Sequence, residues 1–452
     1  MNKFNANELS DFARYYGFHY DGINPFALVK EVLIEMERGL EGKTSSLPMI
    51  PSYITPVTVI PPGKTVLALD AGGTNLRTSL VQFNENGEAV TQGMAKTAMP
   101  GTSGHVNADQ FFDIIADAVI PLVKDAKIEG IGFTFSYTME ITTDADGILL
   151  EFSKEVDAPD VIGKTVGKEL REALSRKGFK YNDPIVMLND TVATLLSGLA
   201  SISPDGEEVR SGNDFGAMPG PVIGFILGTG FNTAYPETKI PKINFYSPDS
   251  PQIIVAESGN FKVQNRGKLD LEYDNTTKHP GSYTLEKGAS GAYLGPLTLH
   301  ILKQALKDKV IQFKKSDELL AMPHLETKFL NHFNHNPLAA KGPLGSLFAP
   351  DEGDALAAVQ YISSIVTERG ALYSAAVLAA TVERMNSRFE PYSPVRIAVE
   401  GTTFVRYKGM RRALESYLHQ MLYRDKPRPY VISPVEQASL FGAAVAALSK
   451  KS

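Results

Sequence analysis

The sequence predicts a layered α/β protein with two domains, and three observations lead to this fold class. The chain has 452 residues, whereas a single core stops growing at about 250–300 residues. From Lys64 onward, short apolar runs typical of buried strands alternate with stretches of helical periodicity. Glycines and prolines stand between these segments as turn residues, without low-complexity tracts or short repeats.

The composition narrows the function class. A net charge of -6 and the absence of Lys/Arg runs argue against a nucleic-acid or anionic-lipid partner. The chain has no cysteine, which excludes disulfides, thiol nucleophiles and Cys-ligated zinc and fits a reducing compartment. The N-terminus lacks a signal-peptide pattern, and no window approaches the run of about 18 apolar residues that spans a bilayer. We therefore expect a cytoplasmic protein without a membrane segment.

The N-terminal region predicts a helix and then an irregular connector. Asn24 can cap the helix, Pro25 suits its first position, and apolar residues recur at helical spacing up to Gly39. The later stretch SSLPMIPSYITPVTVIPPGKT carries five prolines. We expect it to be extended or irregular and to lead into a new domain near Lys64.

The rest of the chain predicts strands and helices in alternation. The strand candidates are Val66–Leu69, Leu76–Phe83, Gly130–Phe135, Ile185–Leu188, Val222–Leu227 and Arg396–Val399. The helix candidates are Ala108–Asp125, Thr165–Lys177, Asp190–Ala200, Ser290–Leu306 and Asp354–Met385.

The turn DAGGTN, which follows the first strand, predicts a phosphate site. Its glycines allow positive φ, so successive N–H groups can converge on an anion, and the polar residues after them add donors and positive charge. The carboxylate at the strand end suits Mg²⁺ held through its water shell. For the two glycines alone a plain hairpin is the simpler interpretation, but the whole string after an apolar strand favours phosphate. The candidates are Asp70, Gly72, Gly73, Thr74, Asn75 and Arg77.

A second glycine-rich turn, Gly228-Thr229-Gly230, also follows a strand. It repeats the design of the first turn and suggests a second nucleotide-gripping element, with a plain β-turn as an equally good interpretation. Two other motifs fail. The string GKT occurs three times without the earlier glycine of a Walker loop, and GTGFNT ends in threonine where a dinucleotide fingerprint needs its third glycine.

The string VMLNDTVAT places Asp190 between a strand and a helix. Capping of the helix is the default role for an Asp there. A carboxylate at the carboxyl end of a strand also lies where α/β sheets bind ligands, and could take a proton from an attacking hydroxyl. The pair His332 and His335 has no nearby acidic partner, so we interpret it as surface.

Taken in order, nine strings of the chain resemble the hexokinase family of actin-fold sugar kinases. They are LALDAGGTNLR, GFTFSY, GILLEFSK, NDTVAT, ILGTGFNTAY, VAESGNF, HPGSYTLEK, LETKF and RIAVEGTTF. The resemblance implies an α/β, two-lobed actin-like/ribonuclease H-like ATPase fold with a central cleft. It implies a small lobe of residues 64–189 plus 437–452 and a large lobe of residues 1–63 plus 190–436.

The resemblance also implies the site residues. Asp190 would be the catalytic base that accepts the proton of the sugar 6-hydroxyl. The implied hexose-contacting residues are Ser136, Ser153, Lys154, Asn189, Asn232, Glu257 and Glu286. On the nucleotide side, the first turn and Gly228-Thr229-Gly230 would bind ATP with Thr327, Gly401 and Thr402, and Asp70 would lie toward Mg²⁺. The expected cofactors are therefore ATP and Mg²⁺.

Three positions depart from the family pattern. Ser258 stands where a Trp usually follows the sugar-binding Glu, and Thr138 replaces the Pro of a Ser-Phe-Pro string. Both changes bear on sugar preference. Ala292 replaces a Lys near the ATP site, which bears on ATP affinity.

The sequence thus predicts ATP-dependent phosphorylation of a hexose, with glucose as the expected acceptor and mannose or fructose as alternatives. A sugar-sensing protein with little turnover is a second hypothesis, favoured only by Ala292. The bacterial repressor-kinases fit worse because many members carry a Cys-rich zinc site. An actin- or chaperone-like ATPase has no reason to carry the sugar-contacting set. The sequence leaves the oligomeric state open.

Overall fold

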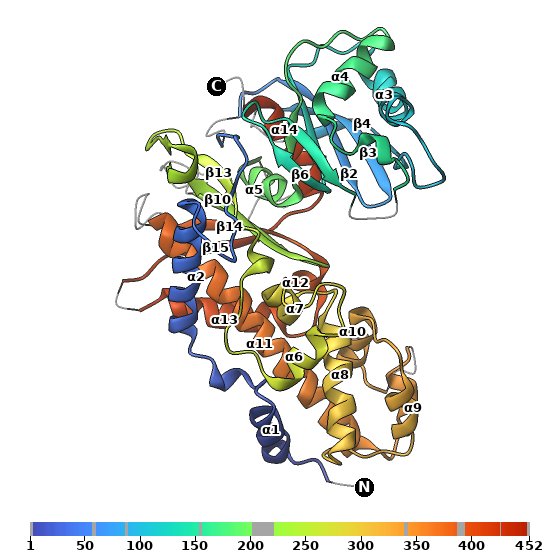
Figure 1. The fold of residues 1–452 in the computed structure, drawn as a ribbon, viewed down its shortest axis with the longest axis vertical. Coiled ribbons are helices and arrows are strands. Elements are labelled where there is room, and N and C mark those ends of the chain that lie inside the picture. Colours follow the sequence, from blue (N-terminus) through green and yellow to red (C-terminus); the bar gives the residue numbers. More distant parts are fainter. Residues whose placement is uncertain are drawn as a thin grey trace.

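A computed structural model describes residues 3–56, 60–85, 89–152, 156–200, 221–338, 342–386, 394–424 and 426–449. Two of the implied sugar contacts, Ser153 and Lys154, lie outside these described residues. Figure 1 shows an elongated molecule with a sheet and its helices at one end and a second sheet with a long helical body below it.

The first sheet has five strands in the order β4-β3-β2-β5-β8. They are β2 (Thr65–Gly72), β3 (Asn75–Phe83), β4 (Ala89–Ala98), β5 (Ile131–Phe135) and β8 (Val186–Leu188). β2, β3 and β4 are antiparallel neighbours, whereas β2, β5 and β8 run parallel. Helices α3 (Ala108–Val123) and α4 (Val166–Arg176) bury one face of this sheet in an apolar core.

The second sheet has six strands in the order β1-β13-β10-β9-β14-β15. They are β1 (Ile50–Pro51), β9 (Val222–Leu227), β10 (Phe231–Glu237), β13 (Gln252–Val255), β14 (Val395–Glu400) and β15 (Tyr430–Pro434). Helices α2 (Pro25–Leu40), α11 (Gly353–Asn386) and α13 (Met410–Leu422) share the largest apolar core with one face of this sheet.

Two helices, α5 (Asp190–Ala200) and α14 (Ala438–Ser449), lie between the two sheets (Figure 1). Their backbones touch, since a Cβ on Gly442 would lie 2.1 Å from the Ala193 carbonyl oxygen. α14 is equally close to β5, because a Cβ on Gly132 would lie 1.9 Å from the Ala443 carbonyl oxygen. Side chains at these glycines are therefore incompatible with the packing.

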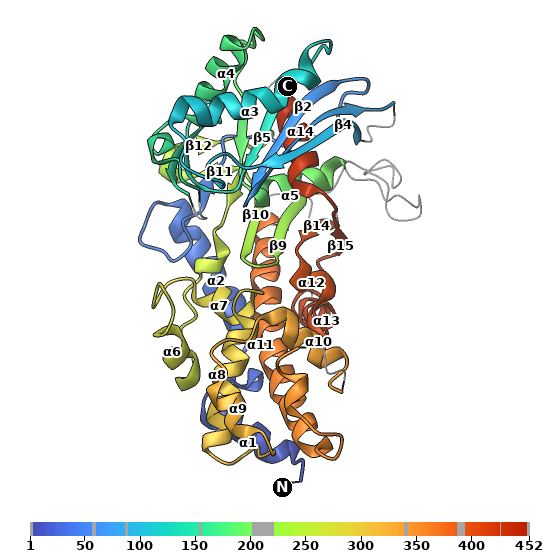
Figure 2. The ribbon, with the colours of Figure 1, turned by 90° about the vertical axis from the view of Figure 1, so that its right-hand side faces the viewer.

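The remaining helices surround α11 in the second body, with α7 and α12 nearest the sheet and α1, α6, α8 and α9 toward the far end (Figure 2). They are α1 (Ala6–Tyr15), α6 (Lys268–Asp274), α7 (Thr284–Ala289), α8 (Leu294–Lys307), α9 (Ser316–Ala321), α10 (Thr327–His335) and α12 (Thr402–Arg406). Two small hairpins complete the described fold, made by β6 (Thr138–Ile141) with β7 (Gly147–Glu151) and β11 (Lys239–Ile240) with β12 (Phe245–Tyr246).

All six predicted strands are present; β9 has the predicted bounds, and the ends of the other five are shifted. β2 continues to Gly72 and β3 begins at Asn75, because the two strands pair with each other past the apolar runs. The predicted helix that began at Ser290 starts at Leu294 instead, after a turn. The division into lobes at 64–189 plus 437–452 stays a proposal, which the separate membership of the two sheets supports.

One helix bears on the expectation that the chain has no membrane segment. By length and composition, Gly353–Met385 of α11 is apolar enough to cross a membrane. However, 94% of its most apolar window is buried inside the molecule. Because buried core helices pass the same test, this is weak evidence for a span.

Candidate active site

A cleft with a volume of about 500 Å³ opens between the two sheets. Segments from both sides line it, including the carboxyl end of β8, the start of β10 and the start of α7. The cleft brings together six of the residues that the sequence assigned to the hexose: Ser136, Asn189, Asp190, Asn232, Glu257 and Glu286.

Asn189, rather than Asp190, caps helix α5. The Val192 N–H donates to Asn189 Oδ1 at 2.8 Å, so the default role considered for Asp190 belongs to its neighbour. Asp190 is the first residue of the helix, and its Oδ1 accepts from the Thr191 hydroxyl at 3.2 Å. The Asp190 carboxylate therefore lines the cleft without serving as the cap.

Asn232 and the two glutamates form a connected polar cluster. Asn232 Nδ2 donates to Glu257 Oε1 at 2.8 Å, and the Phe231 N–H donates to Glu286 Oε2 at 2.9 Å. Glu257 adopts a left-handed backbone conformation, with φ 53°. A non-glycine residue in this region costs about 1–3 kcal/mol and is often found at functional sites.

Burial changes the protonation of these carboxyl groups. It raises the pKa of Glu286 from the ordinary 4.5 to about 7, and the nearby Glu257 adds to this effect. Burial also raises the pKa of Glu257, and the charge of Asp190 contributes in the same direction. Hydroxyl groups that donate hydrogen bonds stabilise closely spaced carboxylates of this kind, and a sugar carries several hydroxyl groups.

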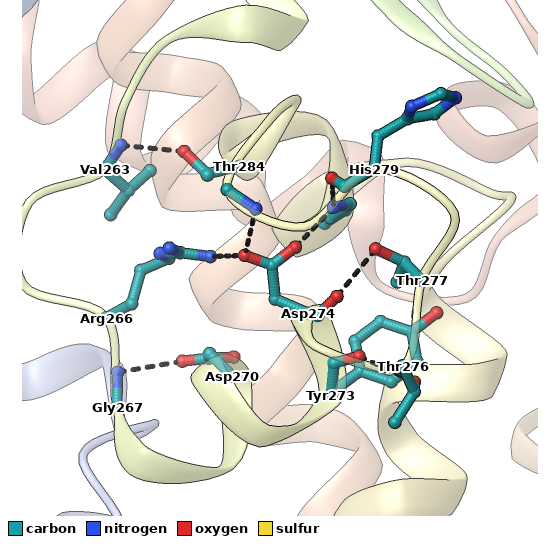
Figure 3. A network of polar contacts seen from close by, with 12 residues as sticks. Val263, Arg266, Gly267, Asp270, Tyr273, Asp274, Thr276, Thr277, His279 and Thr284 are labelled. Atoms are coloured by element: carbon teal, nitrogen blue, oxygen red, sulfur yellow. Dashed lines mark hydrogen bonds and ion pairs between the residues drawn. The ribbon is translucent and has the colours of Figure 1, made fainter.

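A buried ionic network supports the helix that carries Glu286 (Figure 3). Asp274, which is 3% exposed, accepts from Arg266 Nη1 at 2.6 Å and pairs with Lys287 Nζ. Lys287 follows Glu286 directly and also donates to the His279 carbonyl at 2.7 Å. We refer to Arg266, Asp274 and Lys287 as the Asp274 network. It holds α7, and with it Glu286, against the cleft.

The first glycine turn is a two-residue hairpin, because Gly72 pairs with Asn75 across β2 and β3. Only Gly73 of the two glycines has positive φ, at 71°. Asp70 is 1% exposed and is paired with Arg77 directly across the strands. The expectation that Arg77 supplies its charge to a phosphate must therefore include this ion pair.

The expected role of Asp70 toward Mg²⁺ stays a prediction. Its Oδ1 lies toward Gly72, since a Cβ there would be 3.5 Å from it. Among the described residues, no group of three or more His, Cys, Asp and Glu could hold a metal directly. A magnesium ion that keeps its water shell needs only such a single carboxylate together with the phosphates.

A second hollow, of about 480 Å³, contains three of the other predicted nucleotide residues, whereas Gly230 lines the cleft, and Gly228 and Gly401 only adjoin lining residues of the second hollow. Thr229, Thr327 and Thr402 line it together with Ala292, and Lys328, His332 and Arg406 add basic groups.

Glycine 401 fixes the wall of this hollow. It has φ 130°, and a Cβ on it would lie 2.3 Å from the Leu227 carbonyl oxygen. The adjacent Gly228 carbonyl accepts from the Gly291 N–H and from the Thr403 hydroxyl, each at 2.8 Å. Backbone contacts therefore set the shape of this wall.

A hexokinase family model matches residues 222–449, and a second hexokinase model matches residues 17–200. The chain belongs to the hexokinase family. Hexokinase-2 of Candida albicans is 29% identical over an alignment that covers 94% of this chain and 89% of the relative. Hexokinase-2 of Saccharomyces cerevisiae is 28% identical, with coverages of 94% and 89%.

Solved hexokinase structures share the fold. The hexokinase from Schistosoma mansoni complexed with glucose matches 99% of this chain and 100% of its own, with a TM-score of 0.75 and 24% identity. This similarity supports the two-lobed actin-like ATPase fold that the sequence predicted.

Within this member of the hexokinase family, Glu400 lies close enough to Asp190 and Asp70 to interact with their charges, and sequence reasoning did not identify it. Burial raises its pKa to about 7, and the charges of Asp190 and Asp70 add to the shift. Its Oε2 accepts from the Thr194 hydroxyl at 3.4 Å. Glu400 ends β14 directly before Gly401, so the signal that pointed to Asp190, a carboxylate at a strand end, was also present here.

Proposed function

We propose that this protein transfers the γ-phosphoryl group of MgATP to the 6-hydroxyl of a hexose, with glucose as the expected acceptor. Membership of the hexokinase family supports the reaction class. The observation that carries the residue assignment is the shared cleft, where Asp190 lies with Asn232, Glu257 and Glu286.

In this proposal, hydrogen bonds within the protein already orient the groups that bind the sugar. Glu257 is oriented by Asn232, and Glu286 by the Phe231 N–H. Each hexose hydroxyl can both donate and accept, so fixed carboxylate and amide partners select the pattern of hydroxyls. A site that bonds each hydroxyl rejects analogues lacking one by about 10⁴-fold or more.

Asp190 is the proposed base. Its carboxylate would accept the proton of the 6-hydroxyl as that oxygen attacks phosphorus. The two glycine turns would hold the phosphates through backbone N–H groups, and Asp70 would hold Mg²⁺ through water. When bound, the ion neutralises phosphate charge, and the protein supplies mainly alignment.

The test measures ADP release from MgATP with and without a panel of hexoses, for wild type and Asp190→Asn. We expect one hexose to stimulate wild-type turnover, with glucose the most effective. Asp190→Asn should lose about 10²- to 10⁴-fold in kcat because the base is gone, while calorimetric binding of that hexose persists. The variant also excludes a contaminating host kinase.

Two outcomes would contradict the proposal. If glucose binds but no hexose stimulates ADP release, the protein is a sugar sensor, the alternative that Ala292 favours. If mannose or fructose gives the higher kcat/KM, the reaction stands and the acceptor preference is wrong.

A further inference from the structure

One tyrosine hydroxyl joins the sugar side of the cleft to the first glycine turn. Tyr137 lines the cleft, and its hydroxyl donates to the Gly73 carbonyl oxygen at 2.7 Å. The side chain is 6% exposed, with its ring centroid 4.8 Å from that of Phe135 and 5.1 Å from that of Phe152. Neighbouring rings therefore hold the hydroxyl in place. A phenylalanine would pack the same way without making the bond.

The bond fixes the direction of a backbone donor. Peptide units are planar and trans, so the N–H of Thr74 points opposite to the carbonyl of Gly73. No cis peptide occurs among the described residues. Gly73 has positive φ and is the most freely rotating position of the turn. The hydrogen bond from Tyr137 to the Gly73 carbonyl therefore sets the direction of the Thr74 N–H.

The rest of the turn is secured from the same protein body. The Met99 N–H donates to the Thr74 carbonyl at 2.9 Å, and the Ser136 N–H donates to the Ala71 carbonyl at 3.0 Å. These are backbone bonds that any side chain would allow. The Tyr137 bond, in contrast, comes from a side chain. A single substitution can therefore remove it without disturbing the backbone.

We propose that Tyr137 is a positioning residue for the nucleotide, whose hydroxyl orients the Thr74 N–H toward a phosphate of ATP. This rests on the proposed function, because it takes the first turn as the phosphate loop. It goes beyond it by assigning a nucleotide role to a residue of the sugar-side loop.

The experiment compares wild type with Tyr137→Phe and with Tyr181→Phe as the matched control. Tyr181 belongs to the same body and packs against the same apolar core. For each protein we would measure the KM values for MgATP and glucose, calorimetric binding of MgAMP-PNP, and Tm.

Losing one buried hydrogen bond that orients a donor should weaken binding about 3- to 10-fold. We expect Tyr137→Phe to raise the KM for MgATP and the Kd for MgAMP-PNP by this factor. The KM for glucose should change less than about twofold, since the ring remains. Tyr181→Phe should leave both KM values unchanged, and the two variants should lower Tm by similar amounts.

An unchanged nucleotide affinity in Tyr137→Phe would overturn the inference. So would an equal rise of both KM values with a larger fall in Tm than in the control, since that marks general loosening. A wild type that binds MgAMP-PNP without glucose-stimulated turnover would refute the kinase proposal alone, because the calorimetric comparison reads Tyr137 without catalysis.

Discussion

The two hollows of the molecule have nearly the same volume, about 500 and 480 Å³, but they are built in different ways. The cleft presents carboxylate and amide side chains: Asn232 bonds to Glu257, and Glu286 is held by the Phe231 N–H and by its place on α7 beside the Asp274 network. The second hollow presents threonine hydroxyls, the Gly291 backbone and, at its rim, basic groups together with Glu326, and its wall is shaped by backbone contacts of Gly228 and Gly401.

The difference follows from what each hollow is proposed to hold. A sugar offers neutral hydroxyls whose directions must be matched. The protein groups that bind them must therefore be oriented by further contacts within the protein. Phosphates offer charge, which successive backbone N–H groups satisfy when glycine allows the required conformation. Substitutions in the scaffold should therefore damage the cleft strongly, whereas rim substitutions should damage the second hollow only weakly.

Removing the scaffold should give the largest effect. Asp274→Asn leaves Arg266 and Lys287 buried without their carboxylate, and breaking a buried pair in this way costs about 3–5 kcal/mol. We expect this loss in the free energy of unfolding measured in urea, and weaker glucose binding because α7 carries Glu286.

The matched control is Asp351→Asn, which removes the exposed partner of Lys314. Its unfolding curve should overlie that of wild type, since exposed pairs contribute little. Equal behaviour of the two variants would mean that the Asp274 network is not the support of the cleft.

Glu286→Gln tests the difference between the two hollows at a single contact in the cleft. The amide oxygen can still accept from the Phe231 N–H, but at pH 8, above the pKa of about 7 at which Glu286 ionises, the charged partner of the sugar is lost. Hydrogen bonds to charged groups contribute about 1.5–3 kcal/mol, so the KM for glucose should rise roughly 10- to 100-fold. The KM for MgATP should not change, and a parallel rise in it would contradict the separation of the two hollows.

The raised pKa of Glu286 predicts a pH dependence of stability. The folded protein keeps this proton up to about pH 7, whereas the unfolded chain releases it near the ordinary 4.5. Since the folded state then binds more protons, the free energy of unfolding should fall as pH rises from about 4.5 to 7. Glu400 acts in the same direction. In Glu286→Gln, the difference between urea midpoints at pH 5 and pH 8 should be smaller; an unchanged difference would exclude Glu286 as a source.

Arg406→Ala should give the smallest effect. Arg406 is exposed at the rim of the second hollow, where its charge is screened by salt. We expect the KM for MgATP to rise less than about fivefold at low salt and to match wild type near 0.5 M salt. A larger effect that persists in salt would mean that a side chain, not the backbone, dominates this hollow.

Much of the fold could be predicted because local signals were strong. Apolar runs bounded by turn residues marked β2, β5, β8, β9 and β14, and the helical periodicity marked α3 and α4. β4 was not predicted, because its residues are mostly exposed and polar and alternate weakly. β10 and β13 were also not predicted, since the proline in β10 and the short length of β13 obscure the pattern.

The candidate site was likewise predictable only in part. Residues at strand ends, such as Asp190 and Gly228, follow from local pattern, and the cleft brings Asp190 together with Glu257 and Glu286. Their individual roles stay predictions. The pairing of Asp274 with Lys287 could not be predicted, because it joins the end of α6 to α7 through buried side chains without any periodic signal.

The packing of α14 also bears on how the protein is made. The Thr134 hydroxyl in β5 donates to the Ser439 carbonyl in α14, across 305 positions of sequence. The helix that completes one face of the first sheet therefore comes far later in the chain than the strands that it covers. Until α14 is made, the apolar face of β2 and β5 lacks this partner. Contacts so distant in sequence also slow folding, so we expect the first sheet to be completed late.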